Sequence, residues 1–263
     1  MDLPTITTVE QARTRADLRG MSPDCAFLAG GTWLFSEPQN QLNRLIDITT
    51  MGWPPLTIRD DGLEIAATCT IAQLVAHDYP AEWAAAVLFR QCADSLLASF
   101  KVWNAATVGG NMCMGLPAGS MISLGASLGA TLRIWCPDGA ERTTSVLEFV
   151  TGVQTTSLRS GEVLRSIHIP AAALTSSVAF RRISLAPQGR AGSVVIARET
   201  SDGPVLCISA ATKRPYLIPA RSGVDEAVPE SAWYEDAHGA ADWRRSVTAL
   251  LAAEALAALG GAE

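Results

Sequence analysis

Two glycine pairs, Gly30-Gly31 and Gly109-Gly110, interrupt otherwise apolar stretches of this 263-residue chain. A residue with a hydrogen-bonding side chain lies directly after each pair, Thr32 in "AGGT" and Asn111 in "TVGGN". Glycine permits positive φ and lets the backbone approach a ligand closely. A turn whose backbone N–H groups converge can hold a diphosphate without a cationic side chain. A single Gly-Gly pair is more often an ordinary turn, so the question is whether the two pairs act together.

Common nucleotide-binding and catalytic patterns are absent from the sequence. Neither G-x-G-x-x-G nor G-x-x-x-x-G-K-[ST] occurs, which disfavours a dinucleotide fingerprint of the usual type and a P-loop. No Ser/His/Asp or Cys/His arrangement can be argued from spacing, and His168 in an alternating strand is best interpreted as a surface residue. We therefore assign no catalytic residue to this chain.

Composition narrows the class of partner. The formal charge of -6, without any run of Lys or Arg, argues against a nucleic-acid partner. We find no leader pattern and no run of about 20 apolar residues, so we expect no membrane span and a cytoplasmic location. The six cysteines are scattered without a C-x-x-C pair. They are predicted to be small buried hydrophobes in a reducing compartment, with no metal bound.

The N-terminal part of the chain reads as a small unit that ends near Gly52-Trp-Pro-Pro55. The spacing of Thr8 and Gln11 matches a capping box and predicts a first helix. A strand then leads into the first glycine pair, and the apolar run Arg44–Ile48 predicts a further strand.

The next part alternates helices and strands. Thr70 and Gln73 repeat the capping-box spacing and predict a short helix. Pro80 is predicted to start a longer helix through about Ser99, with Trp83, Val87, Leu88 and Gln91 on one face. The predicted strands are Leu63–Ala67, Thr131–Trp135 and Val163–Pro170.

From about residue 176 the pattern changes to short strands separated by turns, typical of an antiparallel meander. A closing helix is predicted to begin at Asp242, to bury Trp243, Val247, Leu250 and Leu251, and to end at Gly260-Gly261. Arg181, Arg182 and Arg190 flank a loop that is interpreted as a solvated hairpin, or alternatively as a loop near a flavin or nicotinamide.

An ordered set of segments resembles a known family. "FLAGGTWLF", "RLIDIT", "LEIAATCTIAQL", "NAATVGGNMCMGLPAGSM" and the closing "WRRSVTALLAAEALAAL" are similar to the FAD-binding medium subunit of molybdenum hydroxylases. That family includes the flavoprotein subunits of carbon monoxide dehydrogenases and the flavin domain of xanthine dehydrogenases. The resemblance runs through nearly the whole chain.

The resemblance implies an α+β fold. Residues 1–172 would form a two-lobed FAD-binding domain of the vanillyl-alcohol-oxidase-like type, with lobes of about residues 1–52 and 53–172. Residues 176–263 would form a small α/β domain with a three-stranded antiparallel sheet and a C-terminal helix.

The resemblance also implies the cofactor and the partners. FAD would lie on the two glycine loops, and its electrons would come from two-iron two-sulfur clusters on a small subunit, reduced by a molybdopterin-containing large subunit. The implied cofactor-binding residues are Ala29, Gly30, Gly31, Thr32, Trp33, Thr107, Val108, Gly109, Gly110, Asn111 and Ser120. The protein would supply binding and orientation while the flavin supplies the redox chemistry.

Three residues depart from the family pattern. Trp33 replaces an acid after "AGGT", Trp103 stands where an Arg is usual, and Ser120 replaces an Asp. Trp33 and Trp103 adjoin the two loops, so either could cover the adenine or flavin ring. Two alternatives to an electron-transfer subunit stay open: a stand-alone flavin-dependent oxidoreductase, and a scaffold subunit that has lost FAD.

Overall fold

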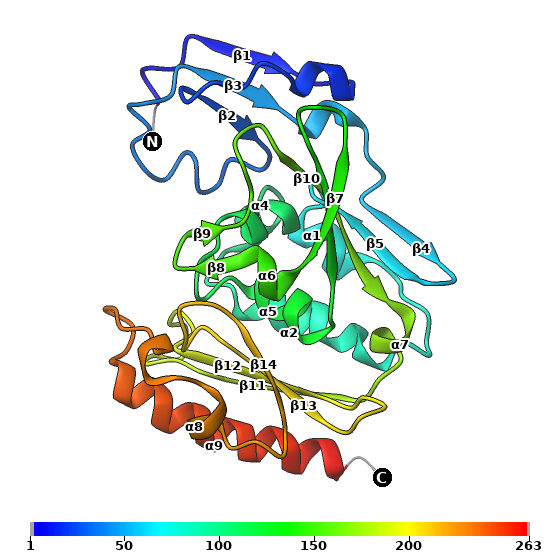
Figure 1. The fold of residues 1–263 in the computed structure, drawn as a ribbon, viewed down its shortest axis with the longest axis vertical. Helices are drawn as coiled ribbons and strands as arrows, with labels where there is room; N and C mark the ends of the chain where they lie inside the picture. Colours follow the sequence, from blue (N-terminus) through cyan, green and yellow to red (C-terminus); the bar gives the residue numbers. More distant parts are fainter. Residues whose placement is uncertain (1–2, 262–263) are drawn as a thin grey trace.

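The computed structural model describes residues 3–261, which form three stacked layers in chain order (Figure 1). The first layer is a three-stranded parallel sheet in the order β1-β3-β2. Its strands are β1 (Thr8–Gln11), β2 (Cys25–Leu28) and β3 (Arg44–Asp47), and two single-turn 3-10 helices follow strands in it, η1 (Arg15–Leu18) and η2 (Thr49–Met51). The first glycine pair comes directly after β2.

The helix predicted at Thr8–Gln11 is wrong. These residues form edge strand β1, which pairs in parallel with β3 from Thr8 opposite Arg44 onward. The capping-box spacing was misleading, because pairing with β3 satisfies the backbone hydrogen-bonding groups of these residues in place of a helix. A reciprocal cap occurs one turn later, where the Asp17 carboxylate accepts from the Thr14 N–H at 2.7 Å and opens η1.

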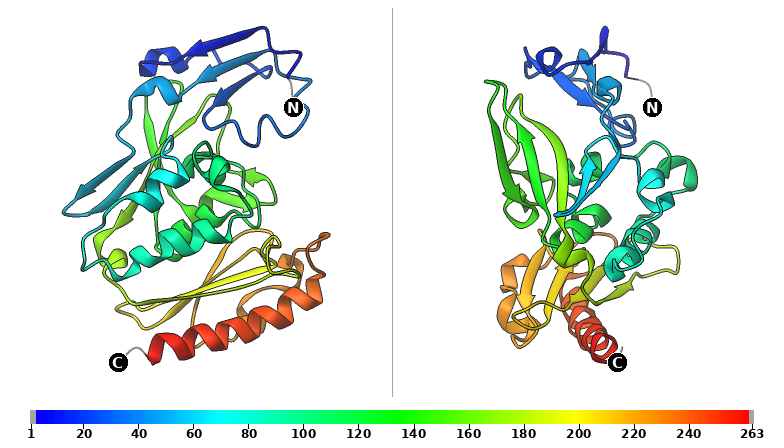
Figure 2. Two further views of the ribbon diagram at one scale, coloured as in Figure 1. Left: turned by 180° about the vertical axis from the view of Figure 1, so that it is seen from behind. Right: turned by 90° about the vertical axis from the view of Figure 1, so that its right-hand side faces the viewer.

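The middle layer is an antiparallel sheet in the order β4-β5-β10-β6-β7, with helices packed on one side of it (Figure 2). Three of its strands match the predicted runs closely, namely β5 (Gly62–Ala66), β6 (Thr131–Trp135) and β10 (Val163–Pro170), whereas β4 (Leu56–Arg59) and β7 (Glu141–Ser145) were not predicted. Its helices are α1 (Ile71–Ala76), η3 (Ala84–Ala86), α2 (Val87–Ser95), α3 (Phe100–Trp103), α4 (Val108–Cys113), α5 (Ser120–Ser127) and α6 (Val146–Phe149). A small hairpin, β8 (Val150–Gly152) and β9 (Thr155–Thr156), follows α6.

The helix predicted between Pro80 and Ser99 is shorter than expected. The α-helix α2 ends at Ser95, because Leu96 turns to an extended conformation with ψ of 120°. Val87 is 50% exposed rather than buried, while Leu88 is fully buried. The early end of α2 has a functional consequence, because it releases residues 96–98 into an irregular segment beside the second glycine pair. The capping box at Thr70 is confirmed: its side chain accepts from the Gln73 N–H at 3.1 Å.

The third layer is the predicted meander, with one strand more than the resemblance implied. The antiparallel order is β11-β12-β13-β14. The strands are β11 (Val178–Ile183), β12 (Ser193–Arg198), β13 (Val205–Ser209) and β14 (Tyr216–Pro219), and α7 (Ala171–Leu174) leads into them. Side chains of β12 alternate, with Val194 and Ile196 packing on the middle layer and Val195 and Ala197 packing toward the final helix. The expected number of three strands was wrong, because β14 was not predicted. This strand follows Pro215 and ends at Pro219, and short runs flanked by prolines resemble turns in a sequence.

The final helix α9 (Ala241–Gly260) runs along the outer face of this sheet, after α8 (Val224–Ala227) and η4 (Glu230–Ala232). Its predicted inward face was wrong at Leu250, which is 57% exposed. The buried stripe is instead formed by Arg244, Thr248, Leu251, Ala252 and Ala255. Arg244 is buried because its guanidinium pairs with Asp236 and donates to the carbonyls of Gly239 and Ala210. These partners precede α9 in the chain, so helical periodicity does not predict them. Within residues 3–261, every helix is too short or too polar to cross a membrane.

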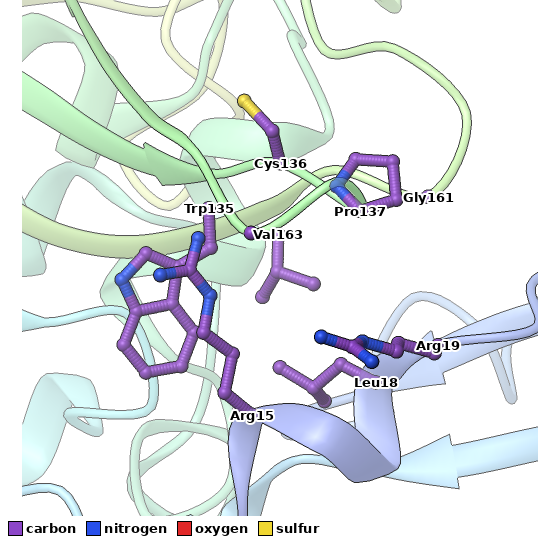
Figure 3. Close-up of a pocket in the computed structure, with 9 residues that line it drawn as sticks. Arg15, Leu18, Arg19, Trp135, Cys136, Pro137, Gly161 and Val163 are labelled. Carbon is purple, nitrogen blue, oxygen red and sulfur yellow. The ribbon is translucent and has the colours of Figure 1, made fainter.

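The first and middle layers are joined by a stack of aromatic rings and guanidinium groups, of which Figure 3 shows Arg15 and Trp135. The Arg15 guanidinium of η1 lies over the Trp135 ring of β6, 4.8 Å from its centroid, and also reaches Glu141 at 3.3 Å. The Arg165 guanidinium lies 4.3 Å from the Trp53 ring centroid, and Trp53 meets Trp135 edge to face at 5.4 Å. These contacts fix how the first layer sits on the middle one.

Candidate functional site

A cavity of about 350 Å³ lies where the first layer meets the α3–α4 side of the middle layer. Both glycine segments contribute to its wall, so we name it the glycine-loop cavity. Its wall is mostly apolar, and no charged side chain lines it among the described residues. The lining residues are Phe27, Leu28, Ala29, Gly30, Gly31, Thr32, Trp33, Leu34, Leu96, Leu97, Ala98, Val102, Ala106, Thr107, Gly110, Asn111, Cys113, Met114 and Leu116.

The first glycine segment, residues 29–34, is shaped by two steric constraints. A Cβ on Gly30 would overlap the carbonyl oxygen of Ala105. The first glycine segment therefore lies in direct contact with the backbone that leads into the second glycine pair. Gly31 has φ of +67°, and a Cβ there would lie 2.6 Å from the Phe35 ring. Both positions therefore require glycine, one for close approach and one for left-handed backbone.

The first glycine segment presents a run of free amides. No backbone N–H of residues 30–34 donates a hydrogen bond to another atom of residues 3–261. The segment closes into a tight turn in which the Phe35 N–H donates to the Gly31 carbonyl at 2.9 Å. Successive amides around a left-handed glycine form a concave anion-binding surface. This run has the donor character that a pyrophosphate needs.

The second glycine segment, residues 107–111, is the start of helix α4 rather than a loop. The Val108 N–H donates to the Cys69 carbonyl at 2.8 Å, and the Gly109 N–H to the Ala67 carbonyl at 3.0 Å. The Gly110 N–H donates to Thr107 Oγ1 at 2.9 Å. A Cβ on Gly109 would lie 2.5 Å from the Ala67 Cβ. The glycine at 109 therefore serves packing against the end of β5, and these three amides are not free for a ligand.

Side chains replace the missing amide donors in the second segment. Asn111 Oδ1 accepts from the Met121 N–H at 3.0 Å, which fixes the orientation of the amide group at the start of α5. Because its oxygen is used in this way, Nδ2 remains as a donor. The Thr107 hydroxyl keeps its proton available as well, since its oxygen acts as the acceptor for Gly110. Both residues line the cavity.

The electrostatics of the cavity depend on dipoles rather than charges. With no Lys or Arg in the lining, an anionic ligand would be stabilised by oriented N–H groups alone. The lining thiol of Cys113 adds no charge, because desolvation raises its pKa to about 12. Residues 3–261 contain Cys25, Cys69, Cys92, Cys113, Cys136 and Cys207 as free thiols.

Of the eleven site residues predicted from sequence, eight line the cavity. Val108 and Gly109 lie behind the wall, buried against β5. Ser120 is 2% exposed in the first turn of α5, is not part of the lining, and its Oγ has no hydrogen-bond partner within the described residues. The two candidate tryptophans are separated by the fold: Trp33 lines the cavity, whereas Trp103 does not and lies under Arg90, 5.5 Å from its ring.

The sequence did not lead us to the apolar part of the cavity wall that lies outside the two glycine segments. It is formed by Leu96, Leu97, Ala98 and Val102, from the segment released by the early end of α2. Leu97 is 61% exposed and Phe100 is 72% exposed. The run "LLASF" was a usable signal, because an amphipathic helix would not place so many apolar residues in succession.

A model of one protein family, the FAD binding domain in molybdopterin dehydrogenase, matches residues 5–172. The chain belongs to this family. Two curated relatives agree. The xanthine dehydrogenase FAD-binding subunit of Escherichia coli O157:H7 is 29% identical over 168 residues, 61% of this chain and 56% of that protein. Aldehyde oxidase 2 of Cavia porcellus is 30% identical over 183 residues, 65% of this chain and 14% of that protein. The chain thus spans about half or less of the length of these relatives.

Several solved structures share the fold over nearly the full length of this chain. Carbon monoxide dehydrogenase from Hydrogenophaga pseudoflava aligns with a TM-score of 0.83 and 21% identity, covering 98% of each chain. Reconstituted CO dehydrogenase from Oligotropha carboxidovorans gives 0.83 and 20%, covering 98% of this chain and 99% of that one. Quinoline 2-oxidoreductase from Pseudomonas putida 86 gives 0.80 and 19%, covering 98% of each. The cofactor of the family is FAD, and the cavity described above has the donors to accept its pyrophosphate.

Proposed function

We propose that FAD binds in the glycine-loop cavity with its pyrophosphate on the amides of residues 30–34. The free N–H run carries this assignment, since it is the longest run of consecutive unused amide donors in the cavity wall within residues 3–261. Asn111 Nδ2 and the Thr107 hydroxyl face the same cavity and would bind phosphate or ribityl oxygens. Val108, Gly109 and Ser120 would act indirectly, by positioning α4 and α5.

The organisation of the chain follows from that assignment. We propose that residues 1–172 form the FAD-binding domain, with lobes of about 1–52 and 53–172 arranged as in the vanillyl-alcohol-oxidase-like type. The cavity lies between β2 of the first lobe and α3–α4 of the second, which supports a two-lobed cofactor site. Residues 176–263 would form the separate C-terminal domain.

The role of the chain would be electron transfer within a multisubunit molybdenum hydroxylase. Bound FAD supplies the redox chemistry, and the protein binds and orients it and excludes water from its phosphates. Electrons would arrive from two-iron two-sulfur clusters of a small subunit, after substrate oxidation at a molybdopterin-containing large subunit. They would leave to an external acceptor. The shared fold with chains of carbon monoxide dehydrogenases supports this role.

A scaffold that has lost FAD is the weaker alternative, because the cavity and its free amides are retained. A stand-alone flavin oxidoreductase differs from the leading proposal in needing no partner subunits. The deciding experiment is the visible spectrum of the purified chain, before and after addition of FAD, followed by co-purification with molybdopterin and iron–sulfur subunits. A chain that takes up no FAD refutes the proposal. Turnover with an electron donor by the isolated flavinated chain favours the stand-alone enzyme.

A further inference from the structure

Trp33 differs from the other tryptophans in lying outside the hydrophobic clusters and ring contacts that hold them. The remaining six have partners: Trp53 and Trp135 contact each other, Trp83 stacks near Tyr79, Trp103 lies under Arg90, Trp233 belongs to the core beneath α9, and Trp243 packs on Gly192 and Gly239. Trp33 belongs to none of the hydrophobic clusters found within residues 3–261, and it has no aromatic or cationic neighbour there. Yet it is half-buried and lines the glycine-loop cavity.

Because no aromatic ring or guanidinium within residues 3–261 stacks on the Trp33 indole, a planar ligand ring could take that place in the cavity. Aromatic rings gain from stacking on another planar ring beyond the area that they bury. The cavity wall also includes the apolar side chains of Leu96, Leu97 and Val102. A planar group bound in the cavity would therefore contact aliphatic side chains as well as the indole.

We propose that the Trp33 indole stacks on the adenine ring of FAD. The inference rests on the proposed function, because it takes the pyrophosphate to lie on the amides of residues 30–34, which include the amide of Trp33 itself. Adenine is separated from the pyrophosphate by one ribose, whereas the isoalloxazine ring is separated by the longer ribityl chain. Adenine is therefore the ring within reach.

The test compares ligands that contain adenine with one that does not. Binding of FAD, ADP and FMN is measured by calorimetry for wild type, Trp33→Ala, Trp33→Phe and Trp33→Leu. Stacking of a base on an aromatic side chain predicts that Trp33→Ala and Trp33→Leu weaken FAD and ADP by on the order of tenfold or more, to the same extent for both ligands. Trp33→Phe should keep most of the affinity, and FMN binding should not change. Quenching of indole emission by ADP should be present in wild type and reduced in Trp33→Phe.

Trp103→Phe is the matched control. Its Nε1 is buried without a partner and its ring does not line the cavity, so the variant should bind FAD and ADP as wild type does. Equal ADP affinity in wild type and Trp33→Leu would overturn the inference while leaving the function intact. So would a loss that affects FMN instead of ADP, since that places the indole on the flavin side. A wild-type chain that binds neither FAD nor ADP refutes the proposed function itself. Circular dichroism shows whether any variant is unfolded. If Trp33→Ala is unfolded, Trp33→Phe and Trp33→Leu are compared with wild type instead.

Discussion

The backbone of Gly30 lies directly against the carbonyl of Ala105, so that the two glycine segments, almost eighty positions apart in sequence, meet in space. A Cβ at residue 30 would overlap that carbonyl, and backbone cannot move aside as a flexible side chain can. The contact brings the free amides of the first segment next to the Asn111 and Thr107 side chains of the second.

Gly30→Ala is expected to abolish FAD binding and to destabilise the fold. Overpacking in a fixed backbone contact typically costs about 1–3 kcal/mol, and here relief requires the first layer to shift away from the cavity. FAD content and thermal unfolding measure the two effects. Gly223→Ala is the control, because nothing lies within 4 Å of a Cβ at that position. A Gly30→Ala protein with full flavin content would contradict the close contact between Gly30 and the Ala105 carbonyl.

Asn111→Asp separates the structural role of this side chain from its role toward a ligand. An aspartate can still accept from the Met121 N–H, so the start of α5 should keep its hydrogen bond. The donor Nδ2, however, becomes a carboxylate oxygen that repels a pyrophosphate. We expect FAD affinity to fall by at least tenfold with a small change in melting temperature. Titration of the apoprotein with FAD checks this, and unchanged affinity would remove Asn111 from the site.

Arg15→Ala tests the contact with Trp135 that holds the first layer on the middle layer. Removing the guanidinium from the Trp135 ring loses a cation–π interaction of about 0.5–2 kcal/mol and the ion pair with Glu141. The melting temperature should fall by a few degrees. FAD affinity should fall too, although Arg15 lies outside the cavity lining. Arg15→Lys, which retains the charge but not the planar group, serves as the comparison. If stability falls and FAD affinity does not, the stack fixes the layers without influencing the cavity.

Glu162 is expected to make stability depend on acid pH. Its side chain is 3% exposed and accepts from Arg142 Nη2 at 2.6 Å and from the Arg159 N–H at 2.8 Å. The Arg142 hydrogen bonds, opposed by desolvation, lower its pKa from 4.5 to about 2. Because the pKa is lower in the folded state, the stabilisation is complete above pH 4.5 and is lost as the pH falls toward 2.

Glu162→Gln should therefore be less stable than wild type by roughly 2 kcal/mol at pH 7, with the difference shrinking below pH 4.5. Urea unfolding of both proteins from pH 7 to pH 2.5 measures the difference. A gap that stays constant over this range would mean that the carboxylate charge is not the source of the stabilisation.

The sequence by itself determined strands β5, β6 and β10 of the middle layer, the first three strands of the third layer, the cap at Thr70 and the family. These signals are local: alternation at Val163–Pro170 or reciprocal bonds between residues 70 and 73 need no distant partner. It also located both glycine segments. It gave no means of telling Thr8–Gln11 from a helix start, because the partner strand that makes these residues a strand lies more than thirty residues away.

Only the tertiary structure decided what each glycine does and which tryptophan faces the cavity. Gly30 and Gly31 leave amides free, whereas the amides at Val108 and Gly109 are already bonded to Cys69 and Ala67. Trp33 and Trp103 both adjoin a glycine pair in sequence, yet only Trp33 lines the cavity. The physical reason is the same in each case. Whether a donor or a ring is available to a ligand depends on what already occupies it, and those partners come from segments that folding brings together.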